Sequence, residues 1–273
     1  MAEYYLATSK NTIDLWLDRR LPYEPKGPML AARVKLRAAI REMHVPQGAL
    51  LCATYSSLDN TFCDAENVLI YNVGTGAFKE ATVGGILFKR IRSEPMCAPN
   101  GSRYSHHHQY SFINAPSQPS GKDSFTFAFP LLAINSSTSV HHVWWRATEA
   151  AAVPHQPIIG RFAIHIELRV VEAITNVAGV LKKLLDGIIS SMHFDAAPSQ
   201  LAIQRLSAHC KWSQAEIEKR LCSPPNPILG KRRVIYEYQQ FVKWDPADHW
   251  CEDCTLVVTR ADTPLCVVTL TEL

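Results

Sequence analysis

The chain has 273 residues, 47% of them hydrophobic, and a formal net charge of +3 at neutral pH. That length and apolar content suffice for a large core, in one domain or two packed lobes. The small net charge gives no overall indication of a nucleic-acid or membrane partner, and no uncharged apolar run reaches the roughly 18 residues of a membrane span. The first residues are not typical of a signal peptide, and the eight scattered cysteines are not typical of a secreted disulfide framework. We therefore expect a cytoplasmic protein.

The first third of the chain combines one basic helix with short strands. Apolar residues recur at helical spacing over residues 29–44 and predict a helix. Arg33, Arg37 and Arg41 follow one another at intervals of four, so they share one face of it. Strands are predicted at 49–55, 67–73 and 85–91. Residues 95–122 are rich in Pro, Ser, Asn and Gly and predict a loop, interrupted by YSHHHQYSF.

The middle of the chain is apolar and aromatic. The segments SFTFAFPLLAI (124–134) and VHHVWW (140–145) both predict sheet, and Pro130 favours an edge strand or a bend. The next segment, FAIHIELRV (162–170), alternates apolar and polar residues over nine positions. This alternation predicts a strand with one buried face.

Three helices and three strands are predicted after residue 175. An apolar stripe at helical spacing runs through VAGVLKKLLDGIISSM, and further helices are predicted at 199–209 and 213–221. Ser213 and Glu216 have the spacing of a capping box. Short strands follow at 232–238, 255–260 and 265–270. The predicted class is α+β, with a largely antiparallel mixed sheet and helices concentrated in the C-terminal half; any two lobes would comprise residues 1–155 and 156–273.

A motif in the predicted helix at 177–192 resembles part of the RusA-type Holliday-junction resolvases. That family has a strand, then a D-x-D-N-x-x-K-x-x-L-D helix, then further acids that bind Mg²⁺. Over about residues 161–195, the K-x-x-L-D part is matched by Lys182, Leu185 and Asp186, and Asp195 follows as a later acid. The resemblance implies a related strand and helix arrangement. Asn176, Ala178 and Gly179 stand where the family has Asp, Asp and Asn, so cleavage in that family's way is not expected.

A second group of candidate residues combines carboxylates with histidines. Asp59, Asp64 and Glu66 precede the predicted strand at 67–73, where they can bind a divalent metal or act as acid and base. If the histidine segments are strands, His106 and His108 share a face and can meet His141 or His142 across a ladder. The alternative is that the acids simply mark the end of a buried strand and the histidines occupy polar positions on an exposed sheet face or loop, with no functional role.

A zinc site is a further possibility at HWCEDC, where Cys251 and Cys254 have ligand spacing and His249 is close. A closed site needs a second pair of ligands, and only irregularly spaced residues on the preceding helices are available for that purpose.

Three functions follow from these features, and whether the chain is an enzyme stays open. The first is a nucleic-acid-contacting accessory protein, with a RusA-like fold that has lost its catalytic acids. Its phosphate contacts would come from basic side chains: Arg33, Arg37, Arg41, Lys182, Lys231, Arg232 and Arg233. The second is a metal-assisted hydrolase that uses the His and carboxylate residues Asp64, Glu66, His106, His108 and His142. The third is a scaffold subunit that binds protein partners in a complex.

Overall fold

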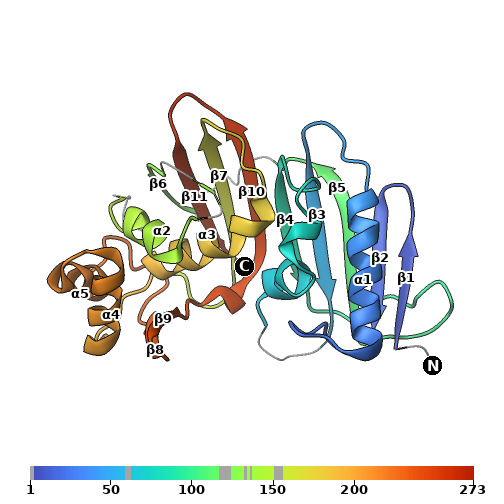
Figure 1. Ribbon diagram of the computed structural model, residues 1–273, viewed down its shortest axis with the longest axis horizontal. Coiled ribbons are helices and arrows are strands. Elements are labelled where there is room, and N and C mark those ends of the chain that lie inside the picture. Colours follow the sequence, from blue (N-terminus) through green and yellow to red (C-terminus); the bar gives the residue numbers. More distant parts are fainter. Residues whose placement is uncertain (1–2, 59–62, 117–123, 132–133, 136, 151–155) are drawn as a thin grey trace.

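The predicted α+β class is confirmed by a computed structural model, which describes residues 3–58, 63–116, 124–131, 134–135, 137–150 and 156–273. Nine strands form one mixed, mostly antiparallel sheet in the order β1-β2-β5-β3-β4-β10-β7-β11-β6 (Figure 1). Its strands are β1 (Tyr4–Thr8), β2 (Thr12–Leu17), β3 (Ala49–Ser56), β4 (Gly85–Ile91), β5 (His106–Asn114), β6 (Ser124–Phe129), β7 (Phe162–Val170), β10 (Cys251–Arg260) and β11 (Leu265–Glu272). A separate hairpin consists of β8 (Ile235–Tyr238) and β9 (Phe241–Trp244).

The described helices are α1 (Gly27–Glu42), α2 (Val140–Ala147), α3 (Val177–Ser191), α4 (Gln200–Cys210) and α5 (Gln214–Cys222), with the short turns η1 (Asn67–Tyr71), η2 (Thr75–Ala77) and η3 (Asp248–Trp250). Four of the five α-helices lie in the C-terminal half, where helices were predicted to concentrate, although one of the four, α2, was predicted as sheet. Ser213 caps α5 through the predicted capping box with Glu216. No helix in the described part of the chain is long and apolar enough to cross a membrane.

The two halves of the sheet repeat one order of elements, although the sequence shows no internal repeat. In the first half, β3 leads through η1 to the parallel strand β4, and β5 returns antiparallel on the other side of β3. In the second half, β7 leads through α3 to the parallel strand β10, and β11 returns beside β7 in the same way. The outer strands β2 and β6 then pair with β5 and β11. The halves meet where β4 and β10 pair antiparallel, and in the strand order the chain crosses from one half to the other between β5 and β6.

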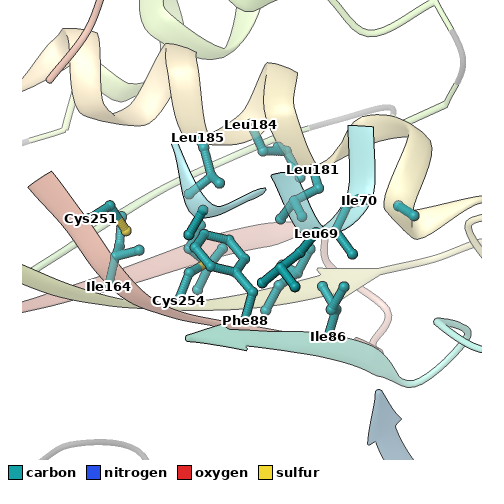
Figure 2. Close-up of a cluster of buried hydrophobic side chains, with 14 of the residues drawn as sticks. Leu69, Ile70, Ile86, Phe88, Ile164, Leu181, Leu184, Leu185, Cys251 and Cys254 are labelled. Carbon is teal, nitrogen blue, oxygen red and sulfur yellow. The ribbon is translucent and has the colours of Figure 1, made fainter. Parts of the chain in front are cut away.

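One face of the sheet is covered by α1, η1 and α3, which lie in front of it in Figure 1. Buried residues of both halves belong to one hydrophobic cluster there. Figure 2 shows its centre, where Leu181, Leu184 and Leu185 of α3 lie over Phe88 of β4 and Cys254 of β10. Burying each such side chain contributes about 1.5–3 kcal/mol, so this contact fixes α3 at the junction of the halves.

Two predicted strands are helical instead. Residues 67–71 form the π-helical turn η1, and residues 140–147 form α2. A short apolar run suits a buried strand and a buried helix equally, so its periodicity cannot distinguish them. The helix α2 packs closely on α3, because Gly187 leaves room: a Cβ atom there would lie 2.6 Å from Cβ of Val143. The segment 124–129 is the edge strand β6, as Pro130 indicated.

Candidate functional site

A lysine surrounded by carboxylates lies where the two halves meet. Nζ of Lys182, on α3, donates hydrogen bonds to Glu66 Oε1 at 2.8 Å, Asp248 Oδ2 at 3.1 Å and Asp186 Oδ1 at 3.2 Å. Glu66 comes from the first half, just before η1, whereas Asp186 lies one turn along α3 and Asp248 begins η3. The lysine therefore joins segments that are 116 and 66 residues away in the sequence.

This cluster contains more carboxyl groups than its single ammonium can neutralise. Burial raises the pKa of Glu66 to about 8 and that of Asp186 to about 7, although Lys182 opposes both shifts. Burial acts to lower the pKa of Lys182, but the surrounding carboxylates outweigh it and raise that pKa, so the ammonium stays charged. Near neutral pH, the cluster therefore favours binding a further proton or a cation.

Three side chains at the edge of this cluster offer atoms that could hold a metal ion. One oxygen each of Asp64 and Asp248 and one ring nitrogen of His249 all lie within 4.8 Å of one another. Carboxylate oxygens suit Mg²⁺ and Mn²⁺, and a mixed carboxylate and imidazole set also suits Zn²⁺. These residues form the only such group in the described part of the chain. The zinc site predicted at Cys251 and Cys254 is absent there, because both thiols lie buried in β10 without a second ligand pair.

A cleft with two exposed tyrosines lies beside these residues. One cavity of about 790 Å³ and another of about 620 Å³ share Tyr23 and Tyr71 in their walls, and we refer to the two together as the tyrosine cleft. The two rings have centroids 6.1 Å apart and an interplanar angle of 20°. Asp64 lines the larger cavity, so one of the three possible metal ligands borders the cleft.

The walls of the tyrosine cleft carry more positive than negative side chains. Its acidic residues are Glu24 and Asp64, and its basic ones are Arg19, Arg20, Arg33 and Arg37. The wall near the larger cavity is fixed by Asn72, whose Nδ2 donates to the carbonyl of Leu21 at 2.8 Å. The cleft therefore combines guanidinium groups with aromatic faces on a fixed backbone.

Only some of the predicted catalytic residues lie together, and Asp59 lies outside the described residues. Asp64 and His106 both line the larger cavity, and Nδ1 of His106 lies 2.8 Å from the hydroxyl of Tyr55. His108 lies on the same face of β5 but is fully buried, and burial lowers its pKa to about 3. Its predicted meeting with His142 is wrong, because His142 lies on a helix and contacts Ser139 and Trp212, whereas β5 pairs with β2 and β3.

The predicted phosphate-binding residues are also dispersed. Arg33 and Arg37 line the smaller cavity, whereas Arg41 is exposed at the end of α1 and lines neither cavity. The prediction for Lys182 is wrong, because three carboxylates already surround its ammonium.

The basic run after α5 lies outside the cleft as well. Arg232 pairs with Asp245 at 3.2 Å, and Arg233 lies over the ring of Tyr236. The backbone of Lys231 forms a bridge with Phe194. None of the three lines the tyrosine cleft, so the run does not extend its basic wall.

Some of the residues that carry the RusA resemblance belong to the candidate site and others do not. Lys182 and Asp186 belong to the carboxylate cluster, but Asn176 caps α3 by accepting a hydrogen bond from the backbone N–H of Gly179 at 3.0 Å. Asp195 accepts one from the N–H of Ala197 and does not contact Lys182. The sequence analysis missed Asp248 and considered His249 only as a zinc ligand. Both are polar residues directly before β10, and that position was the available indication that they belong to a site.

Comparisons with known protein families, curated proteins and solved structures gave no match. The geometry of the cluster and the cleft is therefore the basis for any functional assignment.

Proposed function

We propose that the protein binds nucleic acid through the tyrosine cleft. The observation that carries this proposal is the pair of exposed rings, Tyr23 and Tyr71, set between arginines in two adjoining cavities. Arginine binds phosphate through parallel N–H donors, and aromatic rings stack on bases, so the cleft offers both contacts that a nucleic-acid strand needs.

The salt dependence of binding tests this proposal. Arg19 already pairs with Glu3 at 3.2 Å. If the other three arginines of the cleft each neutralise one phosphate, the slope of log K against log salt concentration is roughly −2 to −3. Fluorescence anisotropy with labelled oligonucleotides would measure this slope, and the variant Arg33→Ala/Arg37→Ala should flatten it by about two. Failure of the wild type to bind any oligonucleotide at low ionic strength would exclude the proposal.

A second candidate function is metal-assisted hydrolysis of a phosphodiester. It is favoured by Asp64, which lines the cleft and also belongs to the possible metal ligands together with Asp248 and His249. A divalent cation there would polarise a phosphoryl oxygen and lower the pKa of a bound water. The chain's own residues would hold the ion and place a bound strand next to it.

Cleavage assays test the second candidate. Labelled single-stranded and duplex oligonucleotides should be cut when Mg²⁺ or Mn²⁺ is added, and Asp248→Asn should abolish the cleavage while leaving binding through the cleft. Binding without cleavage under either metal would leave only the accessory function.

A RusA-like origin remains a proposal with one supporting observation. Acids are missing at Asn176 and Ala178, but the first half brings the carboxylate of Glu66 to Lys182, which also binds Asp186. On this proposal, each half retains a different part of one ancestral site.

A further inference from the structure

We infer that the tyrosine cleft binds an unpaired nucleotide, with its phosphate against Arg33 and Arg37 and its base on Tyr23 and Tyr71. The inference rests on the proposed nucleic-acid binding and narrows it to single strands. Two sets of observations carry it, one for the phosphate and one for the base.

The phosphate side is a pair of guanidinium groups one helical turn apart. Arg33 and Arg37 both line the smaller cavity, opposite the backbone of Gly74, Thr75 and Gly76. Nη1 of Arg33 donates to the carbonyl of Tyr23 at 3.0 Å, which fixes that guanidinium beside the first tyrosine. In the described part of the chain, neither arginine pairs with an acid, and the buried Nε atoms of both have no hydrogen-bond partner. An anion in the cavity would pair with two guanidinium groups that have no carboxylate partner among the residues described.

The loop opposite is shaped to admit one of these guanidinium groups. Gly74 has a φ of 110°, a backbone angle that residues with a side chain rarely adopt. A Cβ atom there would lie 2.4 Å from Nη2 of Arg37. The glycine therefore lets the guanidinium lie directly against the loop backbone. Arg37 is positioned by the fold and does not simply extend into solvent.

The base side consists of two aromatic rings with accessible surfaces. Tyr23 is 62% exposed and Tyr71 is 40% exposed, and their planes are nearly parallel. An exposed ring can stack on a base only if the face of that base is free. In a duplex, neighbouring base pairs already cover those faces, so the rings select unpaired nucleotides. Because Arg33 holds the backbone carbonyl of Tyr23, the base and phosphate contacts are coupled.

The experiment compares a labelled oligothymidylate with a duplex of equal length by fluorescence anisotropy at low salt. The wild type should bind the single strand more tightly. Tyr71→Ala should lower single-strand affinity by roughly 5-fold to 150-fold, and Arg37→Ala should lower it and reduce the salt slope by about 0.7. Arg41→Ala is the matched control, because it removes the same charge from the same helix outside the cleft. Thermal melting of each variant checks that it folds.

One result would overturn the inference while leaving the proposed function intact: equal affinity for the single strand and the duplex, with Arg37→Ala still weakening both more than Arg41→Ala does. Single-strand binding that Tyr71→Ala does not change, or that Arg41→Ala weakens as much as Arg37→Ala does, would place the binding outside the tyrosine cleft and overturn the inference and the proposed function together. If neither probe binds, the proposed function fails and the inference fails with it.

Discussion

Removal of the Lys182 ammonium by Lys182→Met should destabilise the fold in a strongly pH-dependent way. Methionine has an unbranched side chain of similar length but no charge. The substitution therefore leaves Glu66, Asp186 and Asp248 without their shared cation. At alkaline pH Glu66 and Asp186 would be ionised and buried together. At acidic pH these two hold protons, because the folded state already raises the pKa of Glu66 to about 8 and that of Asp186 to about 7.

The magnitude follows from the burial of the cluster. The side chains of Glu66 and Asp248 are 4% and 12% exposed, so solvent screens their charges weakly. Breaking a buried ion pair from one side costs about 3–5 kcal/mol, which should apply near pH 8. For a chain of this size, that loss lowers the melting temperature by roughly 6–10 °C. Near pH 5 the loss should shrink to about 1 kcal/mol, because protonated carboxyl groups need no cation.

The assay is thermal unfolding followed by circular dichroism at pH 5 and pH 8, in a chelator so that no divalent cation replaces the lysine. Glu66→Gln in the Lys182→Met background should restore part of the loss at pH 8, because it removes one uncompensated charge. Equal destabilisation at both pH values would refute the electrostatic reasoning and indicate that the lysine acts through packing alone.

Four further outcomes are expected. Glu66→Gln alone should flatten the pH dependence of stability. The folded state raises the pKa of Glu66 from 4.5 to about 8, so this group contributes stability that is lost as the pH rises through 8. Equal pH dependence of unfolding in the wild type and the variant would contradict the raised pKa. His108→Leu should change the pH dependence at the acidic end instead. Because the folded pKa of His108 is about 3, the wild type loses stability as the pH falls below 6.5, and the variant should lose less. Equal loss of stability below pH 6.5 in both proteins would contradict the lowered pKa. Gly187→Ala should cost about 1–3 kcal/mol by overpacking α2 against α3, and a gain in melting temperature would show that α2 can move away. Mn²⁺ at about 100 times its Kd should stabilise the wild type by roughly 2.7 kcal/mol and Asp248→Asn much less; equal stabilisation would exclude Asp248 as a ligand.

The repeated order of elements explains why the candidate site lies where it does. The equivalent crossovers, η1 and α3, lie on the same face of the sheet, beside the central pair β4 and β10. Each crossover brings the polar residues near its beginning toward the same junction. Glu66 and Lys182 meet there, although 116 residues separate them in the sequence.

The sequence by itself determined the elements whose patterns are long or chemically specific. Nine alternating residues predicted β7, a long apolar stripe predicted α3, and Ser213 with Glu216 predicted the start of α5. These features are local, because strand alternation, helical spacing and capping depend on residues only a few positions apart.

Only the tertiary structure decided the ambiguous segments and the site. Residues 67–71 and 140–147 are short apolar runs, and packing on the sheet and on α3 made them helical. The same packing brought Asp64 to Asp248 and His249, and it placed Arg37 against Gly74. Contacts between distant segments depend on the order and direction in which strands pair. The spacing of residues along the chain does not determine that order.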